Sequence, residues 1–97
     1  MNLNIDNDKL IRVIKTYGVQ AQITVLFEEM AELQKELCKQ RRKQGNIEQI
    51  TEELADVLIM LKQLQAILNL PDERVQEIIN YKMERLSVCI ERERMKQ

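Results

Sequence analysis

The chain has 97 residues, 32% of them charged, and a formal net charge of −1 at pH 7. That length fits one small domain, and the near-neutral balance provides neither a basic surface for nucleic acid nor an acidic tail. The longest uninterrupted apolar run, Val57 to Leu61, is far too short to span a membrane. We therefore expect a single domain over residues 1–97 that binds neither nucleic acid nor a membrane.

The cysteine content and the first residues indicate the compartment. Cys38 and Cys89 lie among helix-forming residues, and the chain has no histidine. They are interpreted as small buried hydrophobic residues in a reducing cytoplasm, not as a disulfide framework, and without histidine they do not make a zinc site. The start, Met-Asn-Leu-Asn-Ile-Asp, lacks the cationic and apolar regions of a secretory signal. We expect a cytoplasmic protein.

The only glycine and proline residues, Gly18, Gly45 and Pro71, divide the chain into four segments rich in helix-forming residues. The first helix is predicted from about Asp8 to Tyr17. The second is predicted from about Val19 to Lys43, and its last turn is basic, which is favourable at a helix C-terminus. The apolar stripe of this second helix comprises Val19, Ile23, Leu26, Met30, Leu33 and Leu37.

The third helix is predicted to begin after Asn46, a good N-cap with Gln49 three residues later, and to continue to about Asn69. Its apolar stripe comprises Ile47, Ile50, Leu54, Val57, Leu58, Leu61, Leu64 and Leu68. The fourth helix starts near Pro71, which suits the first helical position. Its stripe comprises Val75, Ile78, Ile79, Leu86, Cys89 and Ile90.

Four amphipathic helices with short connections predict an all-α, four-helix bundle-like unit. A chain this short buries only a limited core. The third helix also carries apolar residues off its main stripe, among them Ile59 and Ile67. A second apolar face suggests a partner subunit, so we expect the unit to oligomerise through Ile59 and Ile67.

Asp56 stands alone in the most apolar stretch of the chain, residues 54–61, which contains no basic residue. An isolated carboxylate in apolar surroundings is costly unless it is paired or neutralised. Glu53 lies three residues earlier, one helical turn away. Three more carboxylates lie on the second predicted helix: Glu28, Glu29 and Glu32. Acidic pairs on two helices suit a hard divalent cation such as Mg²⁺, which takes oxygen ligands.

The two acidic groups face each other only under one condition. Counted from Gly45, Glu29 lies 16 residues before and Glu53 eight residues after, which is roughly 24 Å against roughly 12 Å along antiparallel helices. The groups meet only if the loop is longer than it looks or if the second helix ends early. The stretch 40–46 contains no apolar residue, which permits the early end.

Other interpretations of these acids stay open. A Glu-Glu-x-x-Glu run is ordinarily a solvated helix face, and Asp56 can instead form an inter-helix salt bridge. A non-catalytic helical oligomerisation or adaptor module would use the acids in salt bridges between subunits, and Mg²⁺ would not stabilise it. A carboxylate di-iron bundle needs Glu-x-x-His motifs, which the absence of histidine excludes.

The spacing of the acids resembles a known family. Glu28-Glu29-x-x-Glu32, followed after 20 residues by Glu53-x-x-Asp56, is similar to the motifs of the MazG-like all-α nucleoside triphosphate pyrophosphohydrolases. The resemblance covers nearly the whole chain. It implies hydrolysis of the α–β phosphoanhydride of nucleoside triphosphates, dependent on Mg²⁺ or Mn²⁺, to a nucleoside monophosphate and pyrophosphate. It also suggests a house-cleaning role against non-standard nucleotides.

The resemblance assigns roles residue by residue. The metal ligands would be Glu29, Glu32, Glu53 and Asp56. Glu28 or Glu32 would act in catalysis, accepting the proton of the attacking water.

On the last helix, Asn80, Lys82 and Arg85 resemble the stretch of the family that contacts phosphate. Lys82 also lies within an apolar stripe, where a lysine must extend to solvent or meet an anion. The family further implies a homodimer, or a homotetramer of two dimers, in which neighbouring subunits help to close the nucleotide pocket.

Overall fold

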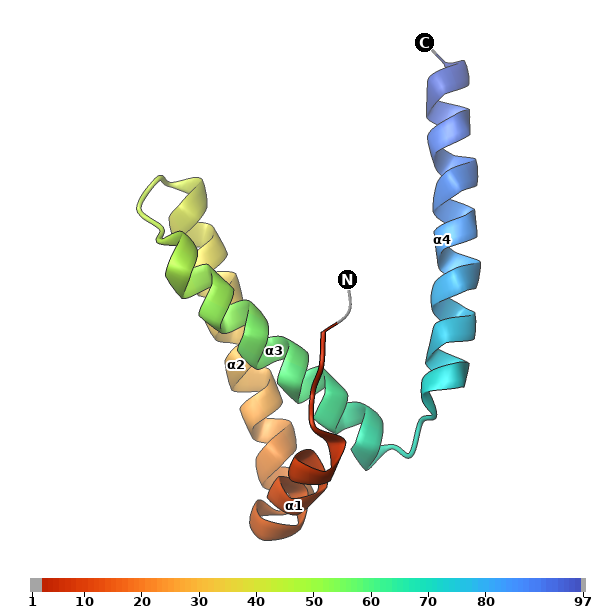
Figure 1. The fold of residues 1–97 in the computed structure, drawn as a ribbon. Coiled ribbons are helices and arrows are strands. Elements are labelled where there is room, and N and C mark those ends of the chain that lie inside the picture. The colour runs from red at the N-terminus through yellow and green to blue at the C-terminus, as the bar shows by residue number, and fades with distance from the viewer. Residues whose placement is uncertain (1–2, 97) are drawn as a thin grey trace.

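The computed structural model describes residues 3–96, and all regular elements in that range are helices (Figure 1). In chain order they are α1 (Asn7–Tyr17), α2 (Val19–Arg41), α3 (Ile47–Ile67) and α4 (Asp72–Met95). The predicted all-α fold class is confirmed, and each predicted helix is present with bounds shifted by only one or two residues at the ends the sequence specified.

The helix ends follow from a few local interactions. Asp6 caps α1 by accepting a hydrogen bond from the Lys9 amide at 3.2 Å. Gly18 then separates α1 from α2 with φ at +92°, a conformation that side-chain-bearing residues rarely adopt. Asn46 caps α3 as predicted, because its Oδ1 accepts from the Glu48 amide at 2.8 Å.

The turn between α2 and α3 is tight. Helix α2 ends at Arg41, two residues before the predicted end, and Lys43 adopts a left-handed conformation with φ at 60°. A Cβ on Gly45 would lie 2.6 Å from the Gln40 Cα. Only glycine allows this close approach. With α2 ending at Arg41 and α3 beginning at Ile47, Glu29 lies 12 residues from the end of α2 and Asp56 nine residues from the start of α3, so the early end of α2 and the connection over residues 42–46 together reduce the offset between the two acidic groups.

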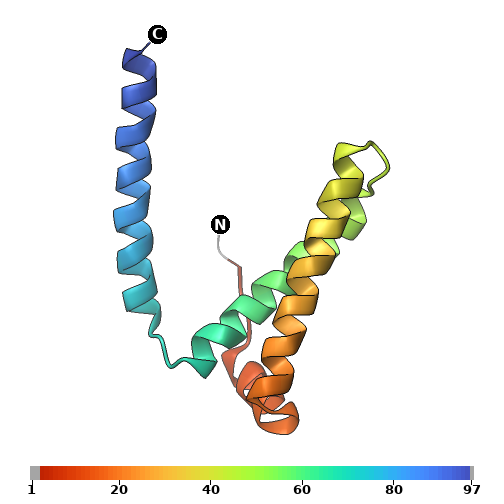
Figure 2. The same cartoon turned by 180° about the vertical axis from the view of Figure 1, so that it is seen from behind.

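Helices α2 and α3 form an antiparallel pair, and α1 packs across the end where α2 begins and α3 finishes (Figures 1 and 2). Helix α4 packs against none of the other three in the described residues. The chain bends by 119° from α3 into α4. The prediction of a four-helix bundle is therefore wrong for the single chain, because α4 points away from the pair instead of covering it.

The buried faces of α2 and α3 differ from the predicted leucine stripes. The buried apolar residues are Leu10, Leu26, Val57 and Met60, and the buried polar residues are Gln22, Glu36, Glu53 and Gln63. Leu54 and Leu61, predicted as core, remain 47% and 43% exposed. The contact between α2 and α3 thus lies beside the leucines and takes in glutamate and glutamine side chains instead.

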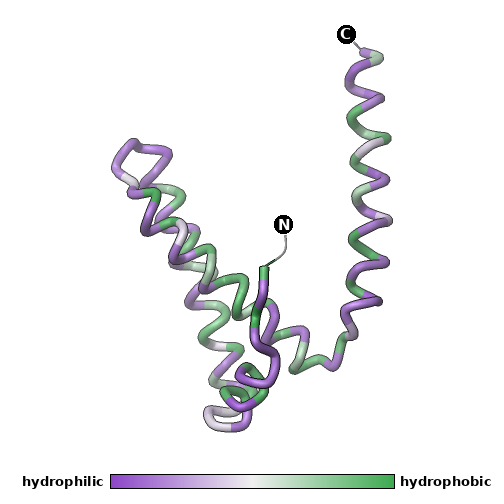
Figure 3. Tube along the Cα trace, viewed as in Figure 1, coloured by the Kyte–Doolittle hydropathy of each residue, from purple (hydrophilic) through white to green (hydrophobic). Residues whose placement is uncertain are grey.

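Two further expectations are corrected. Cys38 and Cys89 are exposed, not buried: α2 turns Cys38 outward, and none of the other described helices packs on α4, which carries Cys89 (Figure 3). Ile67 is half-buried and lines a cavity with Ile11 and Ile14 of α1, so it is not on a free outer face. The predicted role of Ile59 in a subunit interface stays a prediction: Ile59 is exposed, on the side of α3 that carries Asp56.

Among the described residues no single helix is long and apolar enough to cross a membrane; α3 and α4 meet the length and composition criteria only as a pair bent by 119°.

Candidate metal centre

Three carboxylates meet between α2 and α3. Glu29 of α2 and Glu53 and Asp56 of α3 each offer one oxygen atom, and these oxygens all lie within 4.8 Å of one another. We call Glu29, Glu53 and Asp56 the carboxylate cluster. Its members come from two rigid helices, and the tight turn at Gly45 sets the register that brings them level.

The cluster runs from the protein interior to solvent. Glu53 is buried at 9% exposure, Glu29 is half-buried and Asp56 is exposed. Glu53 Oε1 accepts a hydrogen bond from Gln49 Nε2 at 2.8 Å, whereas Glu53 Oε2 is buried without a hydrogen-bond partner in residues 3–96. A buried carboxylate oxygen without a hydrogen-bond donor is energetically costly. A cation bound to Glu53 Oε2 would remove that cost.

The charges of the cluster are uncompensated. The pKa of Glu29 is raised, first by burial and then by the charges of Asp56 and Glu53 and a hydrogen bond with the Asp56 carboxyl. No member of the cluster forms an ion pair within the described part of the chain, so the inter-helix salt bridge considered for Asp56 is absent there. Like charges held this close favour either a shared proton or a bound cation.

The two remaining acids of α2 lie outside the cluster. Glu32 is exposed, yet near enough for its charge to contribute to the raised pKa of Glu29. Glu28 is exposed and turned roughly 100° away from Glu29 on the helix. Glu32 is therefore at the rim of the candidate centre, and Glu28 is farther out.

Gln49 is the residue that sequence reasoning missed. It was expected to return to the N-cap of α3, but its side chain reaches one turn forward and holds Glu53. The i to i+4 spacing of Gln49 and Glu53 is the signal that could have shown this contact. By fixing one oxygen of Glu53, Gln49 leaves the other oxygen free for a ligand.

The predicted phosphate-contacting residues do not reach the cluster within one chain. Asn80, Lys82 and Arg85 are on α4, which packs on none of the other helices in the described residues. Lys82 and Arg85 line a shallow cavity on α4 itself, and Asn80 Oδ1 accepts from Gln76 Nε2 at 2.9 Å. These side chains could approach a carboxylate cluster only from another copy of the chain.

The donor set fits a hard divalent cation. All three cluster side chains offer carboxylate oxygens, which Mg²⁺ and Mn²⁺ prefer. Comparison of the chain with protein-family models, curated proteins and solved structures found no match. A function is therefore inferred from the chemistry of the site.

Proposed function

We propose that this protein is a MazG-like nucleoside triphosphate pyrophosphohydrolase that requires Mg²⁺ or Mn²⁺. The observation that carries the proposal is the carboxylate cluster, whose three oxygens lie within 4.8 Å of one another. The buried, unpartnered Glu53 Oε2 supports it, because a bound cation would remove the cost of leaving that atom without a partner.

The proposed roles follow from burial and position. Glu29, Glu53 and Asp56 would hold the metal, with Glu32 completing the set from the rim. A bound divalent cation would neutralise charge on the triphosphate and lower the pKa of a water nearby. Gln49 would keep Glu53 in place through its hydrogen bond.

The proton must go to a carboxylate because the chain has no histidine. Glu32 is exposed beside the cluster and is the proposed proton acceptor, with Glu28 as an auxiliary acid farther out. The water oxygen would bond to the α-phosphorus while the bond from that phosphorus to the bridging oxygen breaks. The products would be a nucleoside monophosphate and pyrophosphate.

Asn80, Lys82 and Arg85 are proposed to contact phosphate from a neighbouring subunit, since α4 does not reach the cluster of its own chain. This makes a homodimer, or a homotetramer of two dimers, part of the proposal. A basic side chain added to the three carboxylates would supply the positive charge that the single chain lacks there.

The substrate class is proposed to be ribo- or deoxyribonucleoside triphosphates, with removal of non-standard nucleotides in the cytoplasm as the role. Tyr17, Phe27 and Tyr81, the only aromatic residues, are all exposed and distributed over three helices. A base would therefore meet few stacking surfaces within one chain, which favours a broad substrate range.

A panel of standard and modified nucleoside triphosphates, incubated with Mg²⁺, tests the reaction type. Pyrophosphate is the expected first product for at least one substrate, and chelation of the metal should abolish it. Orthophosphate as first product would indicate cleavage at the γ-phosphate and contradict the proposal. No hydrolysis of any triphosphate in the panel would contradict it as well.

The alternative is a non-catalytic oligomerisation or adaptor module. The observation that favours it is α4, whose apolar residues are exposed along its length. An adaptor would bind partners through that helix and would gain no stability from Mg²⁺. Metal-dependent stabilisation therefore distinguishes the two functions before any substrate is known.

A further inference from the structure

One side of the α2–α3 pair is apolar, and most of its residues are exposed. We call this set the leucine face: Met30, Leu37, Leu54, Leu58 and Leu61. Around the axis of α2, Met30 and Leu37 lie roughly 80–100° from Glu29. Around the axis of α3, the three leucines lie roughly 140–200° from Asp56, and both rotations have the same sense when each helix is followed from its N-terminus to its C-terminus. Because the helices are antiparallel, the same sense of rotation leads to the same side of the pair. The leucine face is thus continuous across both helices and points away from the exposed acids.

Helix α4 has an apolar stripe of its own, and none of the other helices in residues 3–96 packs against it. Ile79, Leu86 and Ile90 recur at helical spacing on one flank, and all are exposed. Figure 3 shows apolar residues along the whole of α4. In proteins, most of the stability of a helix comes from tertiary packing of its amphipathic face. A 24-residue amphipathic helix therefore needs a surface that covers this stripe.

A groove joins the two apolar surfaces at the α3–α4 corner. It has a volume of about 390 Å³, and its apolar lining comprises Leu3, Ile5, Leu58, Leu61, Leu64, Leu70 and Val75. Val75 is the one residue of α4 that is partly buried. Lys62 and Gln65 also line the groove, and its apolar residues connect the leucine face with the first turn of α4.

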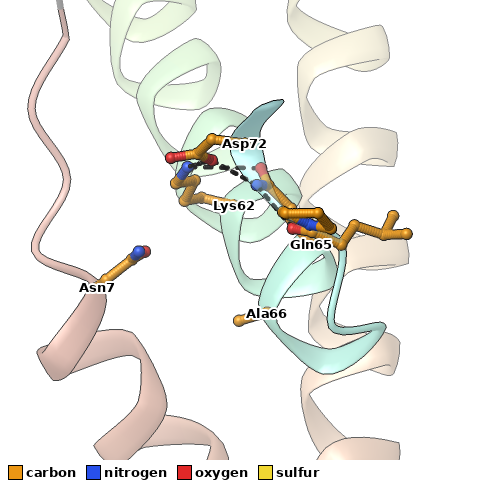
Figure 4. Close-up of a pocket in the computed structure, with 7 residues that line it drawn as sticks. Asn7, Lys62, Gln65, Ala66 and Asp72 are labelled. Atoms are coloured by element: carbon orange, nitrogen blue, oxygen red, sulfur yellow. Dashed lines mark hydrogen bonds and ion pairs between the residues drawn. The ribbon is translucent and has the colours of Figure 1, made fainter. Parts of the chain in front are cut away.

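The corner holds α4 away from its own α3. Lys62 Nζ donates to Asp72 Oδ1 at 2.7 Å, and Gln65 Nε2 donates to the same oxygen and to the Leu70 carbonyl (Figure 4). These bonds tie the first turn of α4 to the last turns of α3. With the chain bent by 119° from α3 into α4, the stripe of α4 cannot lie along the leucine face of the same chain.

We propose that α4 of a second copy occupies the angle between α3 and α4 and packs on the leucine face, in a reciprocal exchange about a two-fold axis. This inference does not depend on the proposed activity. Each chain carries both the helix and the surface that receives it, which is the requirement for a two-fold, self-complementary interface. The lengths also match, at about 36 Å for α4 and about 32 Å for α3.

The exposed area has the size that such an exchange needs. The chain exposes 8211 Å², whereas a compact protein of its mass exposes about 5,800 Å². The excess of roughly 2,400 Å² per chain is typical of obligate homodimers, whose interfaces bury roughly 2,000–5,000 Å² in total. The radius of gyration, 17.0 Å, likewise exceeds the roughly 12.5 Å expected for a compact domain.

Charge on α4 favours a protein occupant over a lipid surface. Acidic and basic residues alternate along the helix in nearly equal numbers, whereas helices that lie on anionic membranes have a strongly basic polar face. A reciprocal exchange also leaves the opposite side of the pair, with Asp56 and Glu32, open to solvent. A ligand can then reach the carboxylate cluster in the dimer. Because the partner's α4 lies on the other side of the pair, the phosphate contacts proposed for Asn80, Lys82 and Arg85 would come from the second dimer of a homotetramer.

Two matched pairs of variants test the interface by sedimentation and light scattering of the full chain. Leu86→Asp is in the stripe of α4, and its control, Val88→Asp, is roughly 160° around the same helix; the two residues are 54% and 46% exposed. Leu61→Asp is in the leucine face, and Ile59→Asp is roughly 160° around α3. We expect a wild-type dimer, a dissociation constant raised at least about 100-fold in Leu86→Asp and Leu61→Asp, and little change in both controls.

Each other result would overturn the proposal. A dimer in Leu61→Asp but not in Leu86→Asp would mean that α4 pairs with α4. Dissociation of the dimer by Ile59→Asp alone would show that the interface lies on the side of the carboxylate cluster. Hydrogen exchange of the wild-type chain needs no variant: α4 amides should be protected at high concentration and lose protection on dilution. A wild-type monomer, or α4 protection independent of concentration, would contradict the exchange.

Discussion

The two sides of the α2–α3 pair lack different interactions. On one side, Glu29 and Asp56 approach Glu53 without any ion pair in the described residues. On the other, leucines such as Leu54 and Leu61 remain nearly half exposed. Uncompensated carboxylates are satisfied by a cation, whereas apolar area is satisfied by a protein surface. We therefore expect a ligand on the side with the carboxylate cluster and a protein partner on the leucine face.

The largest expected effect is on the ligand side. Asp56→Asn keeps the size of the side chain but removes one charge from the cluster, and Asp56 is exposed, so folding should be little affected. We expect pyrophosphate release to fall by more than about 100-fold, because changes even beyond the direct ligands of a metal cost about 10–100-fold. Glu84→Gln, an exposed acid on α4, is the control and should retain its rate. Equal activity in both variants would place the site elsewhere.

Gly45→Ala should disturb the register of the two helices. The new Cβ would lie 2.6 Å from the Gln40 Cα and 2.8 Å from the Gln40 nitrogen, so the turn must open. We expect a loss of about 1–3 kcal/mol in the free energy of unfolding, as for other overpacked sites, together with weaker stabilisation by Mg²⁺. Gln44→Ala, in the same turn, is the control for chemical denaturation. An unchanged stability in Gly45→Ala would show that the turn does not set the register.

Glu53→Gln separates stability from metal binding. The substitution removes a buried charge that faces two other carboxylates, so the metal-free protein should gain about 1–3 kcal/mol in free energy of unfolding. Stabilisation by Mg²⁺ should disappear at the same time. Gln63→Met removes another buried oxygen without a partner, and there the stabilisation by Mg²⁺ should persist. Destabilisation of the metal-free Glu53→Gln protein would contradict the proposed repulsion among the carboxylates of the cluster.

Much of the fold follows from local sequence signals. Gly18, Asn46 and Pro71 predict where helices begin and end, because each acts on its own backbone or its first turn. The rotation of the helices was not predictable in the same way. Apolar periodicity combines residues that face the chain's own core with residues that face a partner, so Leu54 and Leu61 were assigned to the core. Helix α4 was assigned to the bundle for the same reason.

The candidate site was predictable in composition but not in extent. The motif spacing indicated Glu28, Glu29, Glu32, Glu53 and Asp56, of which the structure brings Glu29, Glu53 and Asp56 together. Periodicity gives no reason to bury Gln22 or Gln63, since glutamine is ordinarily a surface residue. Those amides are buried because the contact between the helices lies on the flank beside the leucines.

The smallest expected effect concerns the corner that directs α4. The hydrogen bond from Lys62 holds the pKa of Asp72 below 3.8, with a further contribution from Gln65. Because the pKa of Asp72 is lower in the folded state, this interaction stabilises the folded protein at pH values above the unfolded-state pKa. The stabilisation is lost as the pH falls through the folded-state pKa. In Lys62→Met the Asp72 carboxyl should titrate closer to 3.8 by NMR. An Asp72 pKa equal in both proteins would show that the corner bond does not form in solution.

Thermal unfolding of the wild-type chain with and without Mg²⁺ tests the central claim most directly. If Glu29, Glu53 and Asp56 form a metal centre, the midpoint should rise with Mg²⁺ concentration as linkage requires, and Mn²⁺ should act similarly. Asp56→Asn should show no such rise at equal ionic strength, with NaCl as the matched salt. A wild-type midpoint that responds no more to Mg²⁺ than to NaCl would contradict the metal centre and favour the adaptor function.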